Sequence, residues 1–281
     1  MVSPNRALLA LAGLAAVTSG VLAALALRER RTVDAIRTGL ARTIGPHVTF
    51  SEDMVADLPE PARRFFLHAI KPGTPLAHVA HIEMSGEIKP NEQMGWAPFT
   101  ARQVLTAGRG FLWEARVWMR GMLVTGSDYY LNGEGRMRIA PLGIIPVVDA
   151  AGPDIARAAR ARAVAELIWW LPSSFFLEPA ARIEPVDDRR FVAVYPLDGE
   201  ETRLKLTVDD EGRLLEGVLP RWGNQTETGE FAYIPFGGKV EEERTFDGYT
   251  IASGASVGWW FGTERYREFF RVTLDRVSYD T

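Results

Sequence analysis

One carboxylate, Glu166, lies in an otherwise apolar stretch, and it is the residue at which chemistry is most readily expected. From Ala163 to Leu171 it is the only charged side chain. A helix that is hydrophobic on every side is normally buried, and a buried carboxylate is costly unless it is paired or protonated. Glu166 could therefore be an acid or base with a raised pKa, or a group that holds the polar end of a ligand.

A structural ion pair is the preferred interpretation of Glu166. Arg162 lies one helical turn before it, and Arg221 enters from the later strand-rich part of the chain. Ion pairs of this kind bury carboxylates without any catalytic role.

Tryptophans flank this carboxylate in sequence and add an apolar component to the possible site. Tryptophan packs protein cores, and it also lines hydrophobic grooves that bind ligands. The sequence predicts a ligand-binding group composed of Glu166, Trp169, Trp170, Trp113, Trp118 and Arg221.

Catalytic motifs are weak in this sequence. Residues 254–258 fit the G-x-S-x-G pattern, but a nucleophile elbow needs a following helix and a later histidine, and the last histidine is His81. We predict a turn between strands there. His78 and His81 would point to opposite faces of a strand, so neither a metal site nor a cofactor is predicted, and no catalytic residue is assigned.

The composition of the chain argues against one class of partner and excludes cysteine chemistry. The 281 residues carry a net charge of −4 without a concentrated basic stripe, so nucleic acid is not an expected partner. The chain has no cysteine, which excludes disulfides and thiol nucleophiles.

The N-terminal part contains an uncharged run from Ala7 to Leu27. As a helix its 21 residues would rise about 31 Å, enough to cross the core of a bilayer. A cleaved signal peptide is the alternative, but the run is longer than the usual apolar segment of such peptides. We predict a single-pass anchor in the cytoplasmic membrane. The arginines after the run favour the cytoplasmic side for the rest of the chain.

The rest of the chain is predicted to form strands around one helix. Alternation of apolar and polar residues begins near His78 and predicts ten to twelve antiparallel strands, interrupted by a helix that ends before Pro172. So many strands must curl. We predict an α+β fold in which a large curved antiparallel sheet, a half-barrel, wraps around the central helix, with Arg157, Arg160 and Arg162 at an open rim. Residues 1–31 would be the anchor, 32–57 a connector and 58–281 one β-rich domain.

Several motifs resemble an uncharacterised bacterial family known as a domain of unknown function. They include Leu-Pro-Glu-Pro-Ala-Arg-Arg from Leu58 and Glu-Leu-Ile-Trp-Trp-Leu-Pro from Glu166. The inferred architecture is also similar to the lipoprotein-carrier folds of bacterial envelopes, which bind acyl chains. That resemblance implies an apolar ligand and a place outside the cytoplasmic membrane, in conflict with the arginine distribution.

The function expected from these observations is that of a membrane-anchored protein that binds a lipid or another apolar molecule in the concavity of a curved sheet. Two alternatives stay open. One is a structural envelope protein with a filled core, and the other is an enzyme that uses Glu166 as general acid or base.

Overall fold

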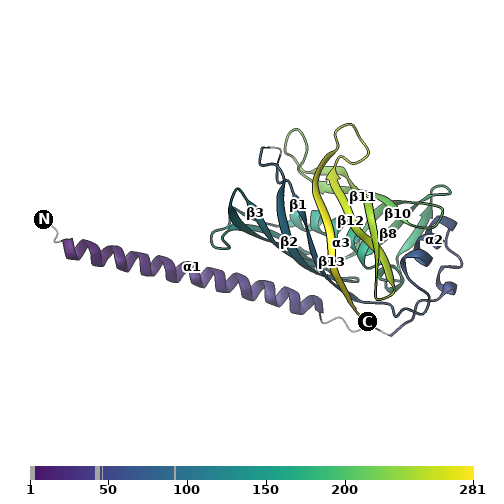
Figure 1. The fold of residues 1–281 in the computed structure, drawn as a ribbon, viewed down its shortest axis with the longest axis horizontal. Helices are drawn as coiled ribbons and strands as arrows, with labels where there is room; N and C mark the ends of the chain where they lie inside the picture. The colour runs from purple at the N-terminus through teal and green to yellow at the C-terminus, as the bar shows by residue number, and fades with distance from the viewer. Residues whose placement is uncertain (1–3, 42–44, 46, 92) are drawn as a thin grey trace.

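The protein is represented by a computed structural model that describes residues 4–41, 45, 47–91 and 93–281. In the first helix, the described side chains are those of residues 20 and 22–41. A curved sheet forms the body of the molecule, and a long helix, α1 (Pro4–Ala41), projects from it (Figure 1).

All strands belong to one antiparallel sheet of 13 strands in the order β6-β5-β4-β3-β2-β1-β13-β12-β11-β10-β9-β8-β7. Neighbouring strands in the sheet are also neighbours in sequence except at β1 and β13, where the two ends of the domain pair. The first arm comprises β1 (Val79–Ile88), β2 (Ala97–Thr106), β3 (Gly110–Met119), β4 (Met122–Leu131), β5 (Glu134–Pro141) and β6 (Val148–Ala151). The second comprises β7 (Arg182–Pro185), β8 (Arg190–Leu197), β9 (Glu200–Val208), β10 (Leu214–Gly223), β11 (Ala232–Phe246), β12 (Tyr249–Trp259) and β13 (Arg267–Asp280).

Helix α3 (Pro153–Trp170) lies in the concavity and contacts both arms of the sheet, most of all β5 and β10 (Figure 1). Two glycines allow this close approach. A Cβ on Gly135 of β5 would lie 2.7 Å from the Cα of Ala156, and one on Gly217 of β10 would lie 2.8 Å from Trp169 Nε1. The prediction of a curved antiparallel sheet around a central helix is therefore confirmed.

Shorter helices close the end of the half-barrel where α3 terminates. They are the 3₁₀ helix η1 (Glu52–Val55), α2 (Glu60–Ala69) and α4 (Ser174–Leu177). Phe65 and Phe66 of α2 join Phe175 and Phe176 in an aromatic cluster with ring centroids about 5 Å apart. Phe50 and Val55, before α2, also belong to the main core.

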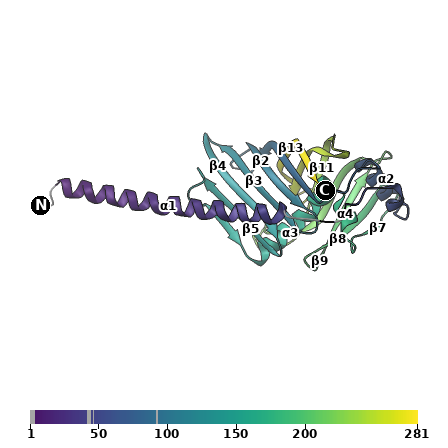
Figure 2. The same cartoon turned by 90° about the horizontal axis from the view of Figure 1, so that it is seen from below.

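The C-terminal part of α1 packs on the outer face of the sheet, along the first arm (Figure 2). Leu40 is fully buried there in a second, small core with Val79, Val104 and Leu112. Arg37 pairs with Glu114 of β3 at 2.6 Å. The first ten residues of the predicted connector, 32–41, are thus the end of α1.

The predicted membrane-spanning stretch, residues 7–27, has its backbone in α1, but most of its side chains lie outside the described set. Within the described part of the chain, no helix reaches the length and apolarity that a bilayer crossing requires.

Candidate functional site

Glu166 lies inside the half-barrel as one member of a network of four polar side chains. Arg162 Nε donates to Glu166 Oε1 at 2.7 Å, and Arg162 Nη1 pairs with Asp128 Oδ2 of β4 at 2.6 Å. Gln103 Nε2 of β2 donates to Glu166 Oε2 at 2.8 Å. Both carboxylate oxygens of Glu166 therefore have a donor, and the preferred interpretation as an ion pair agrees with this geometry.

Two carboxylates keep the Arg162 side chain charged inside the half-barrel. Burial disfavours the charge of Arg162, but Glu166 and Asp128 outweigh this cost and raise the pKa of its guanidinium above the usual value. The same guanidinium lies over the rings of Phe111 and Trp113, with centroid distances of 4.4 and 5.4 Å. Arg162 is therefore a fixed structural cation.

Arg221 of β10 is a second cation in this interior, and its situation differs from that of Arg162. Its Nε donates to the carbonyl oxygen of Ala158 at 3.0 Å, and its guanidinium lies 4.4 and 5.1 Å from the rings of Phe236 and Trp259. No carboxylate among the described residues forms an ion pair with it. Burial, together with repulsion from Arg162, lowers the pKa of Arg221 well below its ordinary value, to about 10.

Between the two arginines runs a continuous set of aromatic side chains, which we call the aromatic arc. Each ring contacts the next, with centroid separations between 4.9 and 6.4 Å. The arc consists of Trp113, Phe99, Phe270, Phe269, Phe236 and Trp259. Its last member lies against Arg221 and its first against Arg162.

The arc lies toward the end of the half-barrel at which α3 begins, where Arg221 contacts Ala158, and we call this end the open end because part of the arc is accessible there. Trp259, Phe269 and Phe270 pack against the main core yet are only partly buried. Trp113 is buried, but its Nε1 atom has no hydrogen-bond partner. The open end therefore offers an apolar surface with a cation at its side.

Trp169 and Trp170 occupy the opposite, filled end of the half-barrel. Trp170 Nε1 donates to the carbonyl oxygen of Ala252 at 3.1 Å, and Tyr279 Oη donates to the carbonyl of Trp170 at 2.9 Å. Trp169 packs against Gly217 of β10. The gap between α2, α3 and β12 at this end has a volume of only about 10 Å³, so it has no room for a ligand.

Trp118 is not brought together with the other predicted site residues. It lies on β3 five positions after Trp113, so it points to the outer face of the sheet, where 57% of its side-chain surface is exposed. The expected position of the helix arginines at an open rim was also wrong for Arg162. Arg160 pairs with Glu200 of β9, and Arg157 lies over the ring of Trp222.

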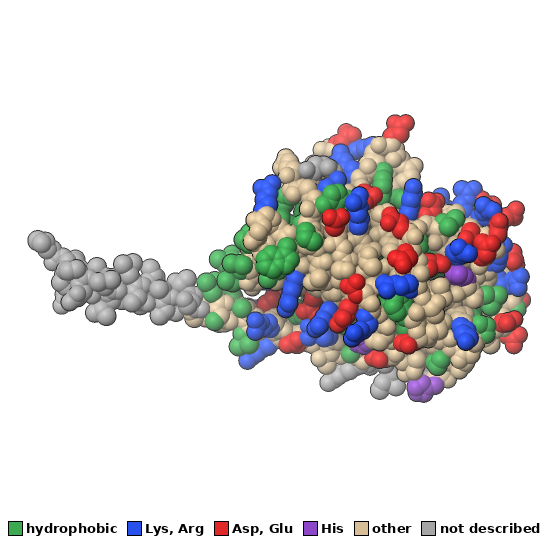
Figure 3. Space-filling view, in the orientation of Figure 1, with side chains coloured by type: hydrophobic (Ala, Val, Ile, Leu, Met, Phe, Trp, Pro, Cys, Tyr) green, Lys and Arg blue, Asp and Glu red, His purple; other side chains and the backbone are tan. Residues whose placement is uncertain are grey.

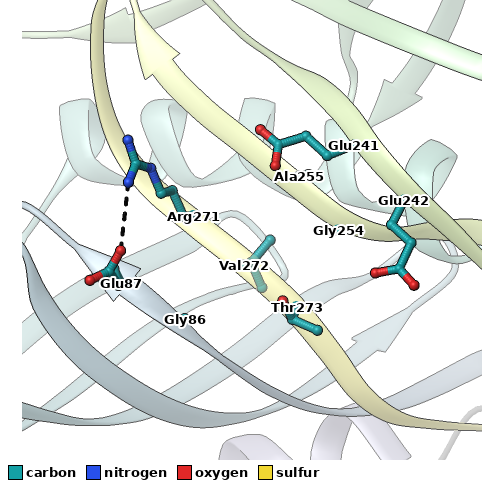
Figure 4. A pocket seen from close by; sticks show the side chains of 9 residues that line it. All are labelled: Gly86, Glu87, Glu241, Glu242, Gly254, Ala255, Arg271, Val272 and Thr273. Atoms are coloured by element: carbon teal, nitrogen blue, oxygen red, sulfur yellow. Dashed lines mark ion pairs between the residues drawn. The ribbon is translucent and has the colours of Figure 1, made fainter.

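A hollow of about 520 Å³ lies elsewhere, among β1, β13, β12 and β11 (Figure 4). It exists because small residues, Gly86, Gly254 and Ala255, line it. Its charged groups are Glu241, Glu242 and the pair formed by Arg271 and Glu87, whose nearest atoms are 3.6 Å apart. Nothing in this hollow combines apolar surface with an unpaired cation.

The remaining sequence motifs do not form a reaction centre. Residues 254–258 lie inside β12, so they are neither a nucleophile elbow nor the turn that we predicted, and Ser256 is buried within the sheet. The described residues contain no group of three or more metal-ligating side chains.

Sequence reasoning missed most of the aromatic arc. Phe99 and Gln103 share the inward face of β2 because they are four positions apart, and Phe270 of β13 stacks on Phe99 at 5.0 Å. The alternation of apolar and polar residues predicts each strand separately. Which strands face each other across the concavity depends on the pairing of β1 with β13, which no local pattern predicts.

Comparison with solved structures gives several matches of similar architecture. A DUF1329 family protein from Desulfovibrio piger is 11% identical, with 82% of this chain and 91% of that chain covered and a TM-score of 0.43. A LolA superfamily protein from Nitrosomonas europaea is 9% identical, with coverages of 83% and 94% and a TM-score of 0.37. A putative outer membrane lipoprotein-sorting protein domain from Vibrio parahaemolyticus is 9% identical, with coverages of 73% and 86% and a TM-score of 0.32.

At such identities these matches are a likeness of fold alone, and they assign no role to this chain. A comparison with curated protein sequences gives no match. The model of one family, described as a family of unknown function (DUF6544), matches residues 48–272. This match covers well over half of the chain and confirms the predicted membership of an uncharacterised family. The chain belongs to the DUF6544 family.

Proposed function

We propose that the domain binds an amphipathic molecule, an apolar chain that ends in an anionic group, at the open end of the half-barrel. The observation that carries this proposal is Arg221. It is a partly buried guanidinium without a carboxylate partner, and its Nη atoms, which have no acceptor among the described residues, stay accessible to an entering group. Burying a cation without a partner is costly, so an anionic group that enters this end gains both charge neutralisation and hydrogen bonds.

The aromatic arc would hold the apolar part of the ligand. Its partly exposed members, Trp259, Phe269 and Phe270, lie next to Arg221 through Phe236. Ligand sites are typically apolar surfaces with a few placed polar groups, and this arrangement has that character. Trp113 continues the surface toward the interior.

Glu166 would act on the ligand only indirectly in this proposal. Its two oxygens are occupied by Arg162 and Gln103, so it holds the network beside the arc rather than exchanging protons with a substrate. This arrangement disfavours the alternative of a general acid or base. Trp169 and Trp170 would contribute to the filled core, and Trp118 would have no part in the concavity.

We also infer that residues 7–27 anchor the chain in a membrane as a single span. The support is the uncharged sequence of this run and the helical backbone that continues through it in α1. Arg28, Arg30 and Arg31, directly after the run, favour the cytoplasmic side of the cytoplasmic membrane for the domain.

The test is photocrosslinking of the full chain, held in an amphipathic polymer, with a long-chain carboxylic acid that carries a diazirine on its chain. We expect crosslinks in the segments that carry Phe99, Trp259 and Phe270. Unlabelled acid should compete, whereas its uncharged methyl ester should compete roughly tenfold less well because it lacks the charge-assisted hydrogen bonds to Arg221. The variant Arg221→Met should bind acid and ester alike.

Arg116→Met is the matched control, because Arg116 is an exposed arginine on the outer face of β3. It should keep the preference for the acid. Equal competition by acid and ester in the unaltered chain would contradict the role of Arg221. A folded chain without any specific crosslink would favour the alternative of a structural protein with a filled core.

A further inference from the structure

Six exposed apolar side chains gather at one end of the first arm of the sheet. They come from the β3–β4 turn and from the connection between β5 and β6, and between 41% and 67% of each is exposed. We call this surface the apolar rim, and it consists of Trp118, Met122, Leu142, Ile144, Ile145 and Val147. Single exposed apolar residues are ordinary, but six of them at one end of a sheet indicate an interaction surface.

The backbone holds the apolar rim in place. Leu142 N donates to the carbonyl oxygen of Leu123 at 2.8 Å, which ties the β5–β6 connection to the start of β4. Val147 N donates to the carbonyl of Ile139 at 2.8 Å, and Gly143 N to that of Ala140 at 3.0 Å. These hydrogen bonds fix the backbone that carries the exposed side chains of the rim.

The rim adjoins α1 at the end of its uncharged run. Arg138 connects the two, because its Nε lies 3.7 Å from Glu29 Oε2 of α1 and its Nη2 donates to the carbonyl oxygen of Ile144. Leu27, the last residue of the run, lies two positions before Glu29 and is half exposed. Figure 3 shows hydrophobic side chains gathered on the part of the domain from which the helix emerges.

Basic residues without carboxylate partners accompany this surface. Five exposed arginines lie in α1 after the run or in β3 and its turn, and none forms an ion pair within the described residues. They are Arg28, Arg30, Arg31, Arg116 and Arg120. The neighbouring carboxylates Glu29, Glu114 and Asp149 already pair with Arg136 or Arg37. Positive charge thus accompanies the apolar rim.

We propose that the apolar rim docks onto the surface of an anionic lipid bilayer, beside the point at which α1 enters it. This inference rests on the proposed anchor in residues 7–27. A span that ends near Leu27 brings the rim to the level of the headgroups, where tryptophan is favoured and arginines meet lipid phosphates. Docking of the rim would hold the whole domain in one orientation on the membrane.

The absence of cysteine in the sequence makes a site-specific test direct. Ile145→Cys and, as the matched control, Leu215→Cys on β10 are each labelled with an environment-sensitive fluorophore in the full chain. Leu215 is also exposed, at 42%, but it lies on the second arm. The chains are reconstituted in vesicles of equal parts phosphatidylcholine and phosphatidylglycerol, with a nitroxide on some of the lipid headgroups as a quencher.

We expect blue-shifted emission at position 145 and quenching roughly threefold stronger than at position 215, since a docked side chain lies within the headgroup boundary. Quenching at position 145 should weaken in vesicles of phosphatidylcholine alone, and also in a chain with Arg116→Gln and Arg120→Gln. Equal quenching in neutral vesicles would overturn the role of the arginines.

Flotation of the vesicles separates the two proposals. A chain that floats with the vesicles but shows equal quenching at positions 145 and 215 overturns the docked rim and leaves the anchor standing. A chain that does not float overturns both. Blue-shifted emission without quenching, together with a dimeric mass in detergent, would show that a second copy of the chain covers the rim.

Discussion

At the scale of single residues, the interior of the half-barrel contains two arginines with opposite energetic roles. Arg162 lies between Glu166 and Asp128, and both carboxylates favour its charge. Arg221 has aromatic rings and one backbone carbonyl as neighbours, and burial lowers its pKa to about 10. The described residues provide no carboxylate that pairs with Arg221, which is why we propose that a ligand supplies its anionic partner.

Replacement of these arginines should therefore have unequal effects on stability. Arg162→Met leaves two buried carboxylates without their cation and should cost about 3–5 kcal/mol of the free energy of unfolding at neutral pH. Arg221→Met should change that free energy by no more than about 1 kcal/mol. The charge penalty, roughly 3 kcal/mol from the lowered pKa, offsets the lost hydrogen bond and ring contacts. Denaturant titration of both variants beside the unaltered chain measures the difference.

The pH dependence provides a check with a definite sign. For the unaltered chain, the penalty at Arg221 is present below pH 10 and relieved as the pH rises through the lowered pKa. The stability difference between the unaltered chain and Arg221→Met should therefore change between pH 8 and pH 11 in favour of the unaltered chain, and a difference that stays constant over this range would contradict the assignment of Arg221 as a cation whose charge the fold disfavours.

At the scale of elements, the position of α3 depends on close approach to both arms of the sheet. Helix and strand backbones meet at Gly135, where a Cβ would lie 2.7 Å from Ala156 Cα and 3.0 Å from its nitrogen. Backbone atoms cannot yield as the end of a flexible side chain can, so the helix itself must shift when this space is filled.

Gly135→Ala should consequently destabilise the fold by about 1–3 kcal/mol. Gly126→Ala on the neighbouring strand β4 is the matched control, since its Cβ would meet nothing closer than 3.7 Å. The control should be within about 0.5 kcal/mol of the unaltered chain. Thermal unfolding followed by tryptophan fluorescence compares them, and equal effects of the two substitutions would show that α3 is not held by this contact.

At the scale of the whole molecule, α1 has two parts with different roles. Its C-terminal part is an element of the fold, because Leu40 is buried against the sheet and Thr106 Oγ1 and Arg109 Nη1 donate to carbonyls of the helix. Arg136 pairs with Glu29 at 2.9 Å. A truncated form that begins at residue 31 would lose this ion pair, whereas one that begins at residue 28 would keep it.

Removal of residues 1–27 should change the free energy of unfolding of the domain by no more than about 0.5 kcal/mol. Removal of residues 1–41 should lower it by about 2–4 kcal/mol, because Leu112 becomes exposed and polar groups lose acceptors. Chemical denaturation of the two shortened chains is the measurement. If both deletions cost the same, the packing of α1 on the outer face contributes nothing to the fold.

The sequence by itself determined the alternating strands, the apolar helix that ends before Pro172 and the curvature of the sheet, because these follow from periods of two and 3.6 residues within short segments. It also determined that Glu166 needs a partner, since an apolar helix cannot bury a free carboxylate. The same alternation could also have predicted that Trp113 and Trp118 point in opposite directions, because residues five apart on one strand point to opposite faces.

Only the tertiary structure decided which side chains meet. The pairing of β1 with β13 joins residues about 200 positions apart, as in the contact of Val79 with Asp280, and it places Phe99 on Phe270. The pairing of β10 with β11 and of β11 with β12 sets Arg221 beside Phe236 and Trp259, and the packing of α3 on the first arm gives Arg162 the carboxylate of Asp128. Local periodicity carries no information about such partners, because they are chosen by the register and curl of the whole sheet.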